Sequence, residues 1–564
     1  MPILKLACFR SVSRTVLGNN VLAALLLLAL VNGGVLTLSA QDSRNAQFQI
    51  PGGGFRIAGK VVNSLGGTPL ARVRVTITDA QSRQNTLSVI TSEDGRFQFL
   101  QIPAGKYGLD GAKRGFIPAS YQQHGEYSTA VVTGAGFDTQ NLVLTLAPFA
   151  VLSGKVLDES GEPIRHANVS LYREDHRAGV GRVQKIRNDT TDDLGAYEFS
   201  GLNAGTYFVS ASATPWYAVH RPVSESLAEG SQVAPSLDVA YPVSYYKDAT
   251  EPDEALPIPI RGGDHLEADI HVNPVPAIRL LFRVPGNPEN GFSLPQLQKP
   301  AFDGMDFVPN QGTEMISPGL YAMTGIAPGA YNVRIPTQGN SVDLDMDLSQ
   351  DGQELDVSKG QPLGTITASV KVVGEETLPA QLSVALRNNK LRVVAWQQVD
   401  SKGNVEFDDV AAGKYEVIAE APGKAYALAH ITSQDVELPG HILNVEGGAS
   451  LNVALSVVGS TMNVDGFAKR NGKPVSGAMI VLVPRNPESN RTMFRRDQTD
   501  MDGSFSLLSV IPGTYTIVAI EDGWDMDWAS PGVIASYSRH GKTIMVSGNE
   551  GTMHLPDTVE VQER

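Results

Sequence analysis

Aromatic side chains gather in several loops of this sequence, where they are suited to binding a ligand. Trp216-Tyr217 and Tyr245-Tyr246 stand among proline, glycine and acidic residues, and a similar loop lies near the C-terminus. Flat rings outside a core can stack on sugar rings, while neighbouring Asp, Asn or Gln side chains bind hydroxyl groups. The candidate ligand-binding residues are therefore Trp216, Tyr217, Tyr245, Tyr246, Trp524 and Trp528.

The same aromatic residues have an alternative role, which is to pack the loops that carry them. Trp216 lies nine residues after Tyr207, and Trp524 lies nine residues after Tyr515. The corresponding position near the N-terminus is Phe116. A common offset from a recurring residue favours packing, so we expect Trp216 and Trp524 to be half-buried.

The sequence carries no pattern typical of a catalytic or metal-binding centre. Neither G-x-S-x-G nor H-E-x-x-H occurs, although ten histidines are present. Three acidic clusters, at residues 343–347, 500–502 and 525–527, could offer oxygen ligands to calcium. The first of them alternates with apolar residues, which favours the solvated face of a strand. We expect no catalytic residue, no metal and no cofactor.

The elements that must position these loops follow a motif that occurs five times. Its first copy, residues 94–107, predicts a turn, a strand with Phe97 and Phe99 on its buried face, and a second turn. In every copy two glycines are ten residues apart, and a tyrosine lies twelve residues after the first glycine. The copies are Gly95, Gly105 and Tyr107; Gly195, Gly205 and Tyr207; Gly319, Gly329 and Tyr331; Gly403, Gly413 and Tyr415; and Gly503, Gly513 and Tyr515. We expect each tyrosine to bury its ring at a sheet corner and to bond nearby backbone through its hydroxyl.

The spacing of the motif predicts tandem domains. Successive copies are 84 to 124 residues apart, which is too long for a solenoid repeat and long enough for each unit to have its own core. We predict a signal segment at 1–40, a flexible leader at 41–54, and domains at 55–148, 149–276, 277–360, 361–456 and 457–564, the last with a short tail.

The N-terminal segment has the composition of a secretory signal peptide. Lys5, Arg10 and Arg14 precede an apolar run at 21–31, and small residues follow as far as Ala40. The alternative is an uncleaved membrane anchor. The only cysteine is Cys8, so no disulfide framework is expected. Removing the segment takes the formal net charge from −15 to −18, which argues against a nucleic-acid partner.

Short motifs in the first domain resemble those of the carboxypeptidase regulatory-like domain. They are Gly59-Lys60-Val61, a G-x-P turn at 67–69, an A-x-V strand start at 71–73, D-G-x-F-x-F from residue 94 and P-A-G-x-Y from residue 103. The second and fifth domains resemble the family comparably, the fourth keeps mainly the hairpin, and the third is the most divergent. The resemblance implies a transthyretin-like β-sandwich, similar to adhesin B-type repeats. It also implies a non-catalytic module, sometimes grouped with carbohydrate-binding folds.

These observations predict an all-β chain of five tandem antiparallel β-sandwich domains, transthyretin-like or immunoglobulin-like, after an N-terminal signal segment. The predicted function is that of a non-catalytic, secreted or cell-envelope binding or structural protein, with carbohydrate as a candidate ligand. The alternatives are an adhesive or spacer rod and an accessory of an outer-membrane transport system. The expected partner is a polysaccharide or a cell-surface protein, met in the periplasm, at the cell surface or outside the cell. Domains three and four lack the aromatic residue at the common offset and are expected to be spacers.

Overall fold

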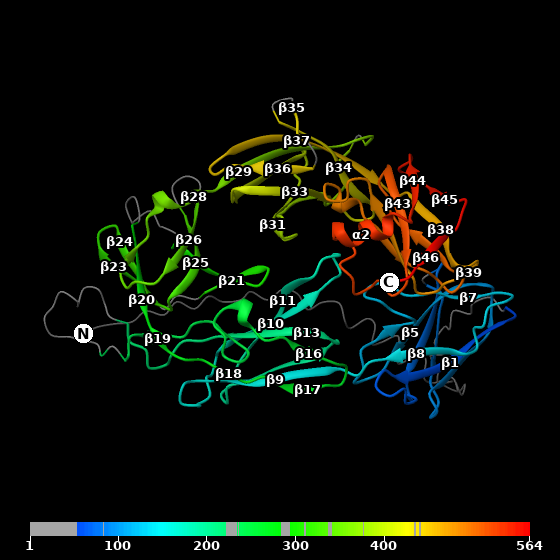
Figure 1. Cartoon of the computed structure of the whole chain (residues 1–564), viewed down its shortest axis with the longest axis horizontal. Helices are drawn as coiled ribbons and strands as arrows, with labels where there is room; N and C mark the ends of the chain where they lie inside the picture. Colours follow the sequence, from blue (N-terminus) through cyan, green and yellow to red (C-terminus); the bar gives the residue numbers. More distant parts are fainter. Residues whose placement is uncertain are drawn as a thin grey trace, which may run out of the picture. The chain divides into compact units, whose positions relative to one another are not determined.

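The computed structural model describes residues 53–564, except for 83, 221–233, 235, 284–293, 309–311, 337–340, 376, 434–435 and 439–440. The predicted signal segment, with Cys8, and nearly all of the predicted leader lie outside the described residues. Within them, strands account for almost all regular structure (Figure 1). The predicted all-β, tandem β-sandwich class is confirmed. No helix in the described part is long and apolar enough to cross a membrane.

We call the five predicted domains modules 1 to 5, and their boundaries remain a proposal. Module 1 has two sheets, and its first strand pairs antiparallel with the hairpin strand and parallel with the last strand. One sheet is β4 (Arg96–Ile102), β1 (Phe55–Asn63) and β8 (Leu142–Leu146). The other is β3 (Thr86–Ile90), β2 (Arg74–Asp79), β5 (Gly105–Ala112) and β6 (Ala119–Ser120), with β7 (Val131–Thr133) also on β5.

Module 2 repeats this plan and adds a longer excursion after its tyrosine strand. Its first sheet is β12 (Ala196–Leu202), β9 (Ala150–Leu157), β17 (His265–Glu267) and β18 (Ile270–His271). Its second is β11 (Arg182–Thr190), β10 (Asn168–Asp175), β13 (Gly205–Ser212), β15 (Ser244–Tyr245) and β16 (Ile258–Ile260). A separate pair joins β14 (Val239–Ala240) to β19 (Val275–Pro276), and a 3-10 turn, η2, spans Pro252–Glu254.

Module 3 keeps the two sheets despite its divergent sequence. The first is β23 (Gly312–Ser317), β24 (Leu320–Ile326), β20 (Ile278–Arg283) and β27 (Gln353–Glu354). The second is β22 (Gly304–Phe307), β21 (Gln296–Ala301), β25 (Gly329–Ile335), β26 (Val342–Leu348) and β28 (Gln361–Pro362). The last of these strands lies just beyond the predicted end of module 3 at residue 360. The turn η4 spans Val357–Lys359.

Module 4 has the longest strands. Its first sheet is β32 (Asn404–Val410), β29 (Gly364–Val372), β37 (Ser450–Ser460), β34 (Ala425–Ser433) and β35 (Val436–Glu437). Its second is β31 (Val393–Gln398), β30 (Ser383–Arg387), β33 (Gly413–Glu420) and β36 (Ile442–Val445). The predicted start of module 5 at residue 457 falls inside β37.

In module 5 the two sheets are joined, because β46 (Val559–Gln562) pairs with both of them. The first sheet contains β39 (Lys473–Pro474), β38 (Asn463–Arg470), β42 (Ser504–Leu507) and β45 (Thr552–His554). The second contains β43 (Gly513–Ile520), β40 (Met479–Pro484), β41 (Arg495–Gln498) and β44 (Lys542–Val546). The turn η5 (Arg491–Met493) and the helix α2 (Pro531–Ser538) lie in its connections.

The first glycine of the motif is required by both its conformation and its surroundings. Gly95 and Gly403 have φ angles of +75° and +87°, which L side chains rarely adopt. A Cβ atom on Gly403 would lie 2.8 Å from the carbonyl oxygen of Val370 on the module's first strand. That strand uses the same turn as a hydrogen-bond partner, because the Val370 amide donates to the Gly403 carbonyl at 2.7 Å. The turn therefore joins the hairpin to the first strand of the module by a backbone hydrogen bond.

The predicted tyrosine corner is present in all five copies. Each ring is buried, and each hydroxyl donates to the backbone carbonyl four residues earlier. The distances are 3.3 Å for Tyr107, 2.8 Å for Tyr207, 2.7 Å for Tyr331, 2.8 Å for Tyr415 and 2.6 Å for Tyr515. Burial raises the pKa of Tyr331 to about 12, so the hydroxyl stays a hydrogen-bond donor at any physiological pH.

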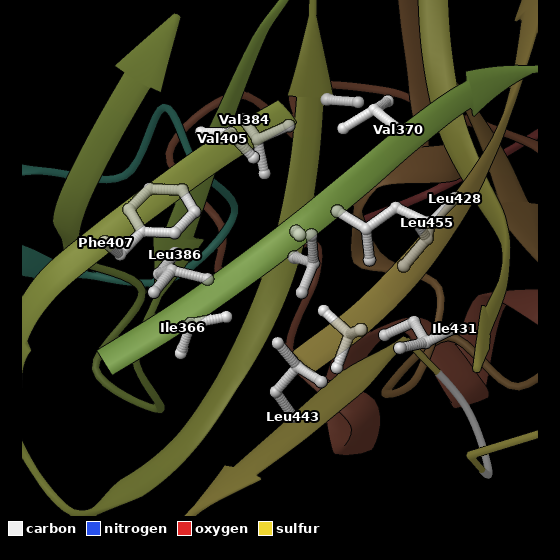
Figure 2. Packing of buried hydrophobic residues seen from close by; sticks show 14 of the residues in the cluster. Ile366, Val370, Val384, Leu386, Val405, Phe407, Leu428, Ile431, Leu443 and Leu455 are labelled. Atoms are coloured by element: carbon white, nitrogen blue, oxygen red, sulfur yellow. The ribbon is translucent and has the colours of Figure 1, made fainter. Parts of the chain in front are cut away.

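Each module has its own apolar core between its two sheets. In module 4, Phe407 of the hairpin strand packs with Ile366, Leu386 and Leu443 from strands of both sheets (Figure 2). Separate cores are what the spacing of the motif predicts. Met501 of module 5 also packs against the core of module 1.

Candidate functional site

The six candidate aromatic residues do not converge on one site. Trp216 and Tyr217 lie on the surface of module 2. Tyr245 and Tyr246 lie in β15 and directly after it, in the same module. Trp524 and Trp528 lie in the loop after β43 of module 5.

Trp216 is 84% exposed, so the expectation of a half-buried ring was wrong for this residue. The next ring, Tyr217, meets it edge-on at 5.8 Å between centroids and turns away to donate a hydrogen bond to Glu159 at 2.5 Å. Tyr241 donates to the other oxygen of the same carboxylate at 3.0 Å. The sequence offset from Tyr207 thus places Trp216 in a loop without giving it a surface to pack on.

The aromatic residues of β15 are used for packing. Tyr245 is only 1% exposed, and its ring meets Tyr172 of module 2 and Phe302 of module 3 at 6.5 and 5.6 Å. Tyr246 is half-buried against the core of module 2. Because the ring of Tyr245 has no free face, it cannot serve as the stacking surface that the sequence predicted.

Trp524 and Trp528 lie among an extensive set of contacts between the first and the last module. We call it the first-to-last junction: Lys106 and residues 122–130 of module 1 against residues 476–504 and 524 of module 5. Trp524 is half-buried there, as expected. Trp528 is 6% exposed and so also lacks a free face for a ligand.

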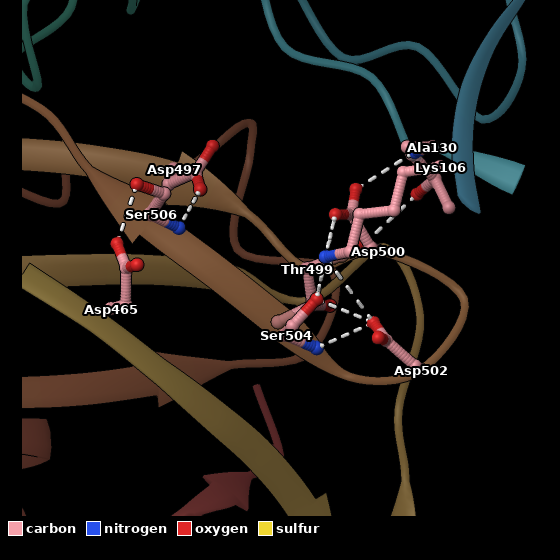
Figure 3. A network of polar contacts seen from close by, with 10 residues as sticks. Lys106, Ala130, Asp465, Asp497, Thr499, Asp500, Asp502, Ser504 and Ser506 are labelled. Atoms are coloured by element: carbon pink, nitrogen blue, oxygen red, sulfur yellow. Dashed lines mark hydrogen bonds and ion pairs between the residues drawn. The ribbon is translucent and has the colours of Figure 1, made fainter. Parts of the chain in front are cut away.

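One side of the junction is a charged network (Figure 3). The Lys106 ammonium donates to Asp500 at 2.7 Å and to Ser504, and it lies 3.7 Å from Asp502. The other oxygen of Asp500 accepts the backbone amide of Ala130 at 2.9 Å. Charge-assisted hydrogen bonds of this kind fix orientation as well as affinity. The acidic pair 500/502, considered above as a calcium site, is thus engaged by a lysine of another module.

A buried amide lies at the centre of the junction. Gln498 is 2% exposed, and its Nε2 donates to the carbonyl of Gln122 at 2.6 Å and to Thr129 Oγ1 at 2.8 Å. Its Oε1 lies 3.0 Å from Nδ1 of His124. Separating the modules would expose the Gln498 amide to water. Substituting its hydrogen-bond partners alone would leave the amide buried and without a partner, which costs free energy.

Aromatic rings and one guanidinium form the other side. His124 stacks on Trp524 with 5.0 Å between centroids and 4° between planes, and Tyr127 meets the same indole at 5.5 Å. The guanidinium of Arg496 lies 4.2 Å from the ring centroid of Trp528 and 5.2 Å from that of Tyr127. Such cation–π contacts contribute most when desolvated, and burial lowers the pKa of Arg496.

Module 2 reaches the same region through the loop after β10. His176 Nδ1 lies 2.8 Å from Asp527, and the amide of Ala529 donates to the carbonyl of Gly179 at 2.9 Å. The Arg496 guanidinium donates to the carbonyl of Arg177 at 3.1 Å. Loops of three modules therefore surround a cavity of about 720 Å³, which His124, Tyr127, Arg173, His176, Arg496 and Trp524 help to line.

Each acidic cluster considered for calcium contains at least one carboxylate that binds a protein partner. Asp343 forms an ion pair with Arg334 at 2.9 Å, and Asp345 accepts from Asn332 at 2.9 Å. Among the described residues, no group of three or more His, Cys, Asp or Glu side chains is placed to hold a metal ion. The loop after β43 therefore binds residues of module 2, namely His176 and Gly179, through Asp527 and Ala529.

Sequence reasoning missed two kinds of residue. Gln498 and Thr129 have no distinctive pattern, because their partners are about 370 residues away. Trp396 on β31 is 56% exposed, but it precedes the recurring tyrosine and so does not share the offset that marks Trp216 and Trp524. The sequence does contain an indication that Trp396 is exposed, because it is followed by Gln397 and Gln398 and does not belong to an apolar alternation.

Residues 56–147 and 151–236 match the carboxypeptidase regulatory-like domain family. A search of the curated proteins finds no match. Among solved structures, the chain is similar to the Bacillus anthracis TIE protein, with 13% identity over 72% of this chain and 74% of that one, at a TM-score of 0.18. A streptococcal ancillary pilin is 12% identical over 55% and 99% of the two chains, at a TM-score of 0.19. GBS52, the minor pilin of Streptococcus agalactiae, is 15% identical over 39% and 97%, at a TM-score of 0.20. TM-scores this low carry no conclusion about arrangement or function.

Proposed function

We propose that this chain, which carries carboxypeptidase regulatory-like domains in tandem, is a non-catalytic binding and structural protein of the cell envelope. Its first and last modules are held together, so that the modules act as one scaffold. The observation that supports this most is the first-to-last junction, with its ion pair between Lys106 and Asp500 and its buried Gln498.

The junction favours a closed scaffold over the alternative of a spacer rod. A rod needs its end modules free of each other, whereas residues 122–130 contact residues 476–504 here. The junction combines buried polar groups with packed aromatic rings, which is typical of a specific interface. An isolated surface ion pair would contribute little, but Lys106 belongs to a network that includes a buried amide nearby.

The proposal of a non-catalytic role follows from what the polar side chains of the junction do. Lys106, Asp500, Gln498 and His176 each have a protein partner at hydrogen-bond distance, so these groups are engaged in holding modules together. The secreted or envelope location follows from the signal-like segment at 1–40, and N-terminal sequencing of the exported protein tests it.

Zero-length cross-linking tests the junction in the full mature chain. A carbodiimide activates a carboxylate, and a lysine amine within contact then displaces the activating group to form an amide. We expect a peptide that joins residue 106 to residue 500 or 502, from protein that migrates as a monomer in a denaturing gel. The ion pair between Lys106 and Asp500 measures 2.7 Å, so no spacer is required.

Lys106→Arg is the matched control. The guanidinium keeps the positive charge and can still bind Asp500, but it is not acylated, so this cross-link should vanish while the thermal unfolding profile is kept. If Lys106 couples only to carboxylates of module 1, or if the joined peptide comes only from dimers, the closed scaffold is refuted and the spacer rod is favoured.

A further inference from the structure

The outer face of one sheet in modules 1, 2, 4 and 5 carries a row of three residues that can be compared between modules. The first residue of the row lies three positions after the recurring tyrosine. The other two are the residues opposite it on the next two strands of the same sheet. In module 4 it consists of Trp396, Ala385 and Ile418. In module 5 the corresponding row consists of Arg496, Val481 and Val518.

This face makes intermodule contacts in modules 2 and 5. In module 5, Arg496 lies against the rings of Tyr127 and Trp528 within the junction. In module 2, Ser210 of the corresponding row contacts the Tyr172 hydroxyl, which donates to Asp306 of module 3. The face therefore takes part in contacts between modules in two of the five modules.

In module 4 the same face lines an open groove of about 840 Å³. The indole of Trp396 is 56% exposed beside it. Ile418 lies on the floor, and Ser383, Gln398 and Glu420 lie along the next row of the sheet. Thr492 of module 5 borders the groove. A concave site with one apolar ring and several polar groups has the composition and size of a small-ligand pocket.

The charges around the groove favour a neutral ligand. Arg387 is paired with Glu416 at 2.6 Å, and Lys424 is paired with Glu375 at 2.8 Å, so the charge of each cation is already balanced by a carboxylate. The exposed Gln398 offers an amide, and Glu420 offers a carboxylate. These groups donate to and accept from hydroxyls, while the indole face suits the C–H face of a sugar ring.

We propose that the groove of module 4 binds a chain of neutral sugars, with one sugar ring stacked on Trp396 and its hydroxyls bonded to Gln398 and Glu420. This inference rests on the proposed function, because it assigns a ligand class to the scaffold. It also revises the expectation that module 4 is only a spacer, since that expectation depended on the absence of an aromatic residue at one offset.

Titration of the full mature chain with four soluble oligosaccharides tests the proposal. The probes are cellohexaose, chitohexaose, laminarihexaose and maltoheptaose, and binding is followed by calorimetry and by tryptophan fluorescence. We expect at least one probe to bind, and Trp396→Ala to weaken that binding by about tenfold or more. The thermal unfolding profile should be kept, because the side chain is exposed.

Two further variants make the test specific. Gln398→Ala should weaken the same binding several-fold, and Trp216→Ala, which removes an exposed indole of module 2, should leave it unchanged. The proposal is overturned if no probe binds, if Trp396→Ala binds as the wild type does, or if only Trp216→Ala loses binding. Concentration-dependent dimerisation that Trp396→Ala abolishes, without sugar binding, would also overturn it in favour of a second copy as the occupant. Failure here with the 106–500 cross-link intact would leave the closed scaffold standing.

Discussion

Replacing Asp497 by asparagine should stabilise module 5 at neutral pH. Asp497 lies on β41, among the junction residues of module 5, and its Oδ2 accepts the amide of Ser506 at 2.6 Å (Figure 3). Burial raises the pKa of its carboxyl from 3.8 to about 6; the Ser506 amide and Lys106 oppose this shift, and Asp500 adds to it. The folded protein therefore holds this proton more tightly than the unfolded chain does.

The sign and size of the effect follow from linkage. A carboxyl with a raised pKa in the folded state contributes its full stability below pH 3.8 and loses it as the pH rises through about 6. The difference between the two pKa values corresponds to about 3 kcal/mol at pH 7. Asparagine is neutral at every pH and keeps an oxygen for the Ser506 amide. It should therefore recover up to about 3 kcal/mol at pH 7 and almost nothing at pH 4.

Scanning calorimetry of the mature chain at pH 4 and pH 7 measures this difference. At pH 7 the transition of module 5 should rise by up to about 14 °C in Asp497→Asn, given a module of about 100 residues. Asp522→Asn is the matched control, because it removes an exposed carboxylate of the same module and should shift neither transition. A loss of stability in Asp497→Asn that is equal at both pH values would refute the reasoning, since it would show that the charged form is not penalised.

Four further outcomes are expected. Tyr415→Phe should lower the stability of module 4 by about 1 kcal/mol, the contribution of one hydrogen bond, measured by denaturant unfolding. Gly403→Ala should cost clearly more than Gly423→Ala in the same assay, because the φ angles are similar at +87° and +85° but a Cβ atom meets the Val370 carbonyl only at residue 403; equal losses would contradict the role given to the close approach. Phe407→Ala should cost about 3–5 kcal/mol and open module 4 alone to limited proteolysis, whereas unfolding of the whole chain in one step would contradict separate cores. Trp216→Ala should leave the unfolding profile within about 0.5 kcal/mol of the wild type, and a larger loss would mean that the ring is buried in solution.

The elements that the sequence predicts well are those determined by neighbours along the chain. The tyrosine corner joins a hydroxyl to a carbonyl four residues away, and the alternation of Phe97 with polar residues determines which face of β4 is buried. Both depend on local geometry that the spacing of the motif already contains. The all-β class and the five cores follow from repeating that local pattern.

The candidate site was predicted less well, because its contacts join residues that are hundreds of positions apart. Nothing near Gln498 indicates that it will be buried against Thr129, and nothing near Trp216 indicates that its ring will be exposed. The two tryptophans share an offset from their tyrosines, yet within the described residues only Trp524 contacts another module. Their environments depend on which module docks on which, a property of the assembled chain.

The ion pair at the junction has a consequence for how the protein is made. Lys106 meets Asp500, which is 394 positions later, so at about 5–20 residues per second the ribosome completes that carboxylate about 20–80 s after the lysine. During this interval module 1 must keep its fold with its own core, and the surface around Thr129 is bare. A chain that ends before residue 500 would keep this surface uncovered permanently. Truncated products would therefore differ from finished ones by this uncovered surface.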